Sequence, residues 1–155
     1  FVIEIANDNS NGQIVLSGKN KDLERFSDFL KEKNIKNVKL AVSAPFHCKL
    51  MNKATEIMKI EIENTNFKDF KNILISNVTA NEVLNSNDLK KLLINQIENR
   101  VRWRESINFM IEKGVQSFTE IGPGKVLSGL IKRIDKNVKI RTINSIDDIK
   151  NFKNE

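Results

Sequence analysis

The sequence predicts an α/β protein, because short stretches with strand periodicity alternate along it with longer stretches with helix periodicity. Apolar residues recur at every second position in the short stretches and at every third or fourth position in the long ones. Glycine, proline and asparagine stand between many of these stretches, as is typical of turns. The 155 residues suffice for one domain with a core, and shares of 39% hydrophobic and 30% charged residues are typical of globular proteins.

The N-terminal part predicts two strands, a helix and a third strand. Phe1, Ile3 and Ile5 fall on one face of an extended segment, and asparagine and glycine crowd the residues that follow. A second short apolar run closes at Gly18, and a stretch with apolar residues at helical spacing comes next. The predicted elements are strands at 1–6, 13–17 and 38–43, a turn at 7–12 and a helix at 21–33.

The middle of the chain predicts a helix, a strand and another helix. After Pro45 the spacing becomes helical, and Leu50, Ala54 and Ile57 share one stripe of the predicted helix. Asn87 and Asp88 are candidate N-caps for the second helix, because their side chains accept hydrogen bonds from a first helical turn. The predicted elements are helices at 48–63 and 87–98 and a strand at 73–79.

The last third alternates helix and strand, which predicts parallel pairing of its strands. Gly114 follows a helical stretch at the place where a left-handed residue belongs. Residues 120–125 read Glu-Ile-Gly-Pro-Gly-Lys and predict a tight turn, although the free N–H groups of the helix that follows are also able to receive an anion. The predicted elements are helices at 103–113, 125–134 and 145–152 and strands at 118–121 and 138–143.

The only histidine, His47, follows a predicted strand and precedes a predicted helix. Catalytic groups of α/β folds gather at the carboxyl ends of strands, and the ordinary pKa of histidine suits proton transfer near neutral pH. A lone histidine in a loop is more often structural or solvated, so its position leaves both interpretations open. The G-x-S-x-G pattern that presents a serine nucleophile is absent. The residues therefore offer a candidate general base without a recognisable nucleophile.

Composition argues against several kinds of site and partner. One cysteine, Cys48, and one histidine are too few for a structural zinc site, so we predict no metal. No apolar run is long enough for a membrane span and no signal peptide is recognisable, so neither a membrane partner nor secretion is expected. The net charge of +6 is able to attract an acidic protein or nucleic acid, but aromatic and basic residues are not interleaved as nucleic-acid binding requires.

Five segments together resemble one protein family. In order and spacing they are similar to the C-terminal half of malonyl-CoA:acyl carrier protein transacylases, and the likeness covers nearly the whole chain. The resemblance implies part of an α/β-hydrolase-like acyltransferase large domain at 41–155, preceded at 1–40 by the later part of a small ferredoxin-like subdomain. The segments are Asn-Ser-Asn-Gly-Gln-Ile-Val-Leu-Ser-Gly at 9–18, Val-Ser-Ala-Pro-Phe-His-Cys-Lys-Leu-Met at 42–51, Ser-Asn-Val-Thr at 76–79, Gln96 with Val-Arg-Trp at 101–103, and Glu-Ile-Gly-Pro-Gly-Lys-Val-Leu at 120–127.

The resemblance also implies a function, which is to move malonyl from coenzyme A to the phosphopantetheine thiol of acyl carrier protein in fatty acid synthesis. The reaction passes through a serine acyl-enzyme whose serine lies in a missing N-terminal half, so we expect these residues alone to be inactive. His47 is implied as general base and then general acid, with the main-chain carbonyl of Gln96 orienting its ring. Phe46 is implied to favour malonyl by leaving little room for a methyl branch, and Asn9 to lie near the cleft.

The implied partners are malonyl-CoA, acyl carrier protein and the N-terminal half, with no cofactor. An enzyme of this type works in the bacterial cytoplasm or in a plastid or mitochondrion, and the sequence does not choose between these compartments. The alternative hypothesis is a basic α/β module that binds protein or nucleic acid without catalysis. A G-x-S-x-G pattern upstream in the coding sequence would favour the enzyme, and a different upstream domain would favour the binding module.

Overall fold

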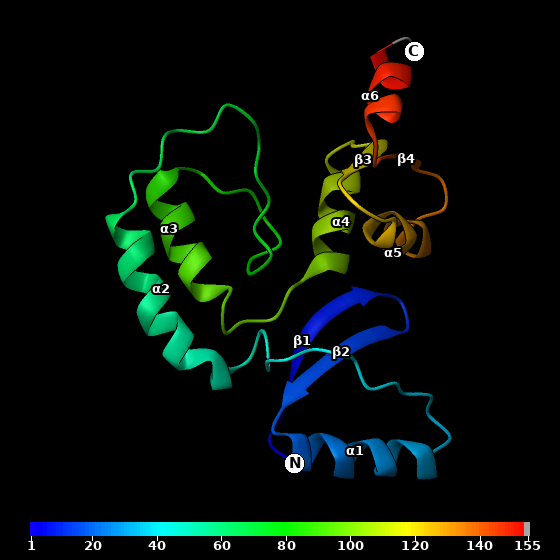
Figure 1. Ribbon diagram of the computed structural model, residues 1–155. Helices are drawn as coiled ribbons and strands as arrows, with labels where there is room; N and C mark the ends of the chain where they lie inside the picture. The colour runs from blue at the N-terminus through cyan, green and yellow to red at the C-terminus, as the bar shows by residue number, and fades with distance from the viewer. Residues whose placement is uncertain (154–155) are drawn as a thin grey trace.

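The computed structural model describes residues 1–153, which form a mixed α/β arrangement (Figure 1). In chain order the elements are β1 (Ile3–Ser10), β2 (Gln13–Gly18), α1 (Asn20–Glu32), the 3-10 turn η1 (Lys49–Met51), α2 (Asn52–Asn64), α3 (Ser86–Asn95), α4 (Trp103–Glu112), β3 (Ser117–Ile121), α5 (Val126–Ile134), β4 (Lys139–Ile143) and α6 (Ile146–Lys153). β1, β2 and α1 form one end, α2 and α3 lie side by side, and α4, α5, α6, β3 and β4 form a third part. β1 joins the first part to the third, because it contacts α4 and α5.

β1 and β2 form an antiparallel hairpin that turns through Gly12, whose φ of 76° suits glycine. The turn predicted at 7–12 is therefore wrong over its first four residues, which continue β1. The cause is a backbone partner distant in sequence. The N–H of Val101 donates to the carbonyl of Ala6 at 2.8 Å, and the N–H of Asp8 donates to the carbonyl of Val101 at 2.9 Å.

Each predicted helix is present, with ends shifted by at most a few residues. The N-cap prediction for α3 is wrong, because the cap is Asn85 and not Asn87 or Asp88. The side-chain oxygen of Asn85 accepts the N–H of Asp88 at 2.9 Å, and the Asn85 amide donates to the Asp88 carboxylate at 2.7 Å. This reciprocal pair satisfies one of the N–H groups that the first helical turn leaves without a partner.

β3 and β4 pair in parallel, as the alternation of helix and strand predicts. The Gly-Pro-Gly turn after β3 uses left-handed glycines, with φ of 130° at Gly122 and 94° at Gly124. The carboxylate of Glu120 accepts the N–H groups of Leu127 and Ser128 at 3.1 and 2.8 Å. An internal carboxylate thus occupies the start of α5, which supports a structural turn over a site for an external anion.

Two predicted strands are not formed. Residues 38–43 have no strand pairing, and residues 73–79 contribute only one isolated bridge. Val38, Leu40 and Val42 alternate as a strand requires, but they are 75%, 52% and 62% exposed. A strand persists only where another backbone pairs with it, and the described part of the chain places no strand beside either segment.

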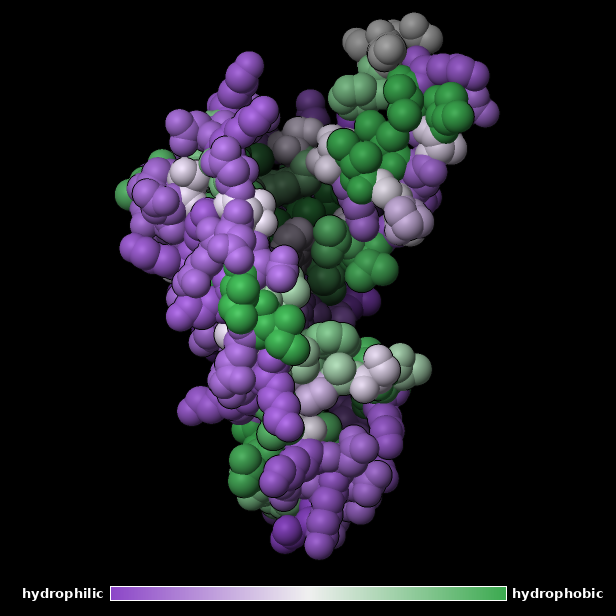
Figure 2. Space-filling view, turned by 60° about the vertical axis from the view of Figure 1, so that its left-hand side comes forward, coloured by the Kyte–Doolittle hydropathy of each residue, from purple (hydrophilic) through white to green (hydrophobic). Residues whose placement is uncertain are grey.

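The chain leaves much apolar surface accessible to solvent. Its accessible surface is 11390 Å², whereas a compact monomer of 17.8 kDa exposes about 8,000 Å². The stripe on α2 contributes to this surface, with Ile57 66% exposed. Figure 2 shows hydrophobic residues lining a recess beside the arm that ends in α6. None of the helices within residues 1–153 has both the length and the apolar character needed to cross a bilayer.

Candidate active site

His47 lies in the loop that precedes η1, and its backbone has φ of 59°. Residues other than glycine rarely adopt this left-handed conformation, so surrounding contacts must hold it. Cys48 supplies one contact, because it is 1% exposed and its thiol donates to the carbonyl of Pro45 at 3.2 Å. The buried cysteine therefore anchors the turn, and the partly exposed His47 stands beside it.

Gln96 provides the hydrogen-bond partner of the imidazole. It is the C-cap of α3, and the last carbonyls of a helix lack the N–H of a following turn. Its carbonyl oxygen lies 2.8 Å from Nδ1 of His47. A carbonyl only accepts hydrogen bonds, so Nδ1 carries the hydrogen and donates it. In the neutral ring Nε2 then holds a lone pair, which makes the arrangement chemically suited to accept a proton.

The structure brings together some of the predicted site residues and separates others. His47 and Gln96 are in contact, and Phe46 stands next to His47 and is 48% exposed. Asn9 lies partly exposed on β1, and no hydrogen bond within residues 1–153 joins it to His47. In the same residues no group of three or more His, Cys, Asp or Glu side chains is placed to hold a metal ion.

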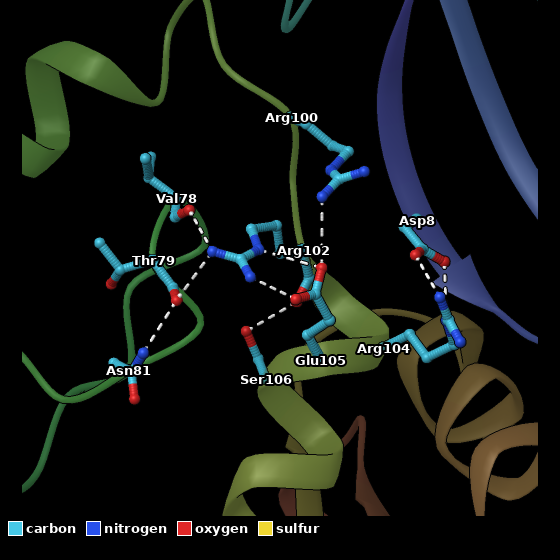
Figure 3. Close-up of polar contacts among 9 residues, drawn as sticks. All are labelled: Asp8, Val78, Thr79, Asn81, Arg100, Arg102, Arg104, Glu105 and Ser106. Atoms are coloured by element: carbon cyan, nitrogen blue, oxygen red, sulfur yellow. Dashed lines mark hydrogen bonds and ion pairs between the residues drawn. The ribbon is translucent and has the colours of Figure 1, made fainter.

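Three arginines that follow Gln96 are engaged by carboxylates (Figure 3). Arg102 forms a two-bonded ion pair with Glu105, and its Nη1 donates to the carbonyls of Val78 and Thr79 at 3.4 and 3.1 Å. Arg100 adds a contact of 3.3 Å to Glu105. These bonds fasten the turn that carries the Ser-Asn-Val-Thr segment to the start of α4.

The third arginine, Arg104, joins α4 to β1 through bonds of 3.0 and 2.7 Å to the carboxylate of Asp8 (Figure 3). The hydrogen bond from Arg104 holds the pKa of Asp8 below its ordinary value, and that from Arg102 does the same for Glu105. Both carboxylates are therefore charged at neutral pH and compete with any ligand for these arginines. This network was not predicted from the sequence. The spacing of three between Arg102 and Glu105 at a helix start could have predicted their ion pair. Asp8 and Arg104 are too far apart in sequence for any spacing to predict theirs.

Comparison with known proteins gives consistent relatives. No protein-family model matches the chain. The chain is 44% identical over 139 residues to the malonyl CoA-acyl carrier protein transacylase of Bacillus subtilis (strain 168), covering 89% of this chain and 44% of that protein. The crystal structure of malonyl CoA-acyl carrier protein transacylase from Clostridium perfringens is similar with a TM-score of 0.92 and 38% identity, covering 99% of this chain and 48% of that one.

A third similar structure holds a type II PKS acyl-carrier protein in complex with its malonyl-transacylase. The TM-score is 0.92 and the identity 33%, over 99% of this chain and 50% of that one. The chain thus spans about half the length of the relatives it matches.

Proposed function

This chain belongs to the malonyl-CoA:acyl carrier protein transacylase family, and we propose that it supplies the histidine of an enzyme that transfers malonyl from coenzyme A to the phosphopantetheine thiol of acyl carrier protein. The observation that carries the proposal is the hydrogen bond between Nδ1 of His47 and the Gln96 carbonyl, which leaves Nε2 as the basic nitrogen. The relatives are enzymes, so they favour this function over a basic binding module without catalysis.

The proposed chemistry uses one imidazole in two roles. Nε2 of His47 takes the proton of a serine hydroxyl while the serine oxygen attacks the malonyl thioester. The imidazolium then gives that proton to the departing thiolate of coenzyme A. In the second half the imidazole takes the proton of the carrier's thiol as its sulfur attacks the acyl-serine. It returns a proton to the serine oxygen that leaves. Protons balance over the cycle, and no cofactor is needed.

Gln96 gives the imidazole an uncharged hydrogen-bond partner in this proposal. A carbonyl oxygen fixes the tautomer and the orientation of the ring, as a buried aspartate does in Ser-His-Asp enzymes, but it brings no charge of its own. Because the acceptor belongs to the main chain, the orientation depends on the end of α3 and not on the glutamine side chain. The ring therefore depends on a helix terminus for its position.

The proposed enzyme needs a second part that holds the serine and covers the exposed apolar residues of this chain. This chain has roughly 3,400 Å² more accessible surface than a compact monomer of its mass. That excess on one chain is well above the roughly 800 Å² that a standard interface buries on each partner. We propose the N-terminal half of the relatives' length as this part, and the acidic carrier protein as a partner steered by the net charge of +6.

The test of the function is an assay of the full-length protein with malonyl-CoA and carrier protein that bears phosphopantetheine. We expect malonyl-carrier product and, without carrier, a protein species heavier by one malonyl group on a serine. Mass spectrometry detects both species. Absence of the acyl-enzyme together with absence of product would contradict the proposed function.

Phe46 precedes His47 in the sequence and is 48% exposed, and its ring is proposed to disfavour branched acyl groups by leaving little room for a methyl group. We expect Phe46→Ala to raise the rate with methylmalonyl-CoA relative to malonyl-CoA by about tenfold, since one methyl is worth about 1–3 kcal/mol. Competition between the two thioesters measures the ratio, with Phe46→Leu as a control of intermediate size. An unchanged ratio in both variants would remove Phe46 from the acyl pocket.

Asn9 is proposed to contact substrate near the cleft, since its side chain is partly exposed on β1. We expect Asn9→Ala to raise KM for malonyl-CoA about threefold with little change in kcat, because it would remove a contact made equally in the ground and transition states. Steady-state kinetics give both constants, and Asn11→Ala in the hairpin turn is the matched control. Equal kinetics of the two variants and the wild type would exclude the contact.

A further inference from the structure

The turn at His47 is held by a side chain from another part of the chain. The N–H of Lys49 donates to the carboxylate oxygen Oε1 of Glu4 at 3.0 Å. Lys49 is the first residue of η1 and lies two residues after His47, whereas Glu4 lies on β1. An N–H at the start of a helical turn has no partner within the turn, and a carboxylate is a strong acceptor for it.

Separate contacts therefore hold three consecutive residues. The ring of His47 is held by the Gln96 carbonyl, Cys48 by burial, and the Lys49 N–H by Glu4. The left-handed backbone of His47, at φ of 59°, persists only if its surroundings enforce it. Glu4 is the contact among these that comes from the hairpin of β1 and β2.

We propose that Glu4 is a positioning residue for His47. Its carboxylate fixes the exit of the turn, so that the imidazole keeps Nδ1 on the Gln96 carbonyl and Nε2 toward the reacting groups. Glu4 acts through the backbone and touches no substrate. The inference rests on the proposed function, and it makes the hairpin of β1 and β2 part of the apparatus that sets the ring.

Glu4→Ala and Glu4→Gln in the full-length protein test the inference. We expect Glu4→Ala to lower kcat about tenfold with KM for malonyl-CoA nearly unchanged, because the turn loses its acceptor. Glu4→Gln keeps an oxygen that accepts the Lys49 N–H, so it should restore kcat to within about twofold. Glu56→Ala removes an exposed glutamate on α2 and serves as the matched control.

Nitrogen NMR of the His47 ring gives a second readout. The wild type and Glu4→Gln should show one tautomer with the hydrogen on Nδ1, and Glu4→Ala a mixture of tautomers. Glu4→Ala with an unchanged spectrum and unchanged kcat would overturn the inference. So would a Glu4→Ala variant that loses thermal stability while its spectrum and kcat stay those of the wild type. If His47→Ala is inactive while Glu4→Ala is not affected, the positioning role fails and the proposed function stands. Full activity in His47→Ala would remove the proposed function itself.

Discussion

We expect replacement of His47 with alanine in the full-length protein to lower kcat/KM for the proposed malonyl transfer by about 10³- to 10⁴-fold. The variant would lack the nitrogen that is proposed to take the serine proton and to return it to the thiolate, and His47 is the single histidine of these 155 residues. The contact with Gln96 gives the wild-type ring the tautomer in which Nε2 is free to accept a proton, so we expect the loss to fall on proton transfer. Initial rates of malonyl-carrier formation measure the effect, with KM for malonyl-CoA expected to change little.

Gln96→Ala is the matched control for this prediction. The alanine variant keeps the carbonyl that accepts the hydrogen bond from Nδ1, so kcat should stay within about threefold of the wild type. A second control is Cys48→Ala, which removes a buried sulfur atom from the turn. This variant should lose more thermal stability than kcat. His47→Ala with wild-type rates would show that another group moves the proton.

Local physics explains which elements the sequence could predict. Helix periodicity and parallel β-α-β order depend on residues a few positions apart, and α1, α4 and the pairing of β3 with β4 follow from them. The strand predicted at 38–43 has the correct alternation, but alternation only makes a strand possible. Pairing decides whether it forms, and the described residues supply no partner strand for it.

The contacts around the candidate site also could not be predicted from residues that are close in sequence. The position of His47 after an apolar stretch is visible in the sequence, and the resemblance to a family pointed to Gln96. No spacing could reveal that Glu4 reaches Lys49, because 45 residues separate them, or that Asp8 reaches Arg104 across 96 residues. Such contacts depend on how β1 lies against α4 and reaches Lys49, which is a property of the tertiary fold.

The second large effect concerns this chain by itself. The isolated 155 residues should transfer no malonyl above the uncatalysed rate, because they lack the G-x-S-x-G nucleophile pattern. Mixing with the separately expressed N-terminal half should restore transfer, since that half is proposed to bring the serine and to cover the exposed apolar part of the accessible surface of 11390 Å². Product formation and the molecular mass of the mixture in light scattering measure both consequences.

Leu40→Lys tests whether the unpaired segment takes part in that association. Leu40 is 52% exposed in this chain, and a charge there would have to be buried if residues 38–43 become a paired strand. We expect this variant to weaken association with the N-terminal half at least tenfold, whereas Lys36→Gln, on an exposed polar position nearby, should bind as the wild type does. Malonyl transfer by the isolated 155 residues would contradict the prediction that the nucleophile lies outside them. Equal binding of Leu40→Lys and Lys36→Gln would show that residues 38–43 stay outside the interface.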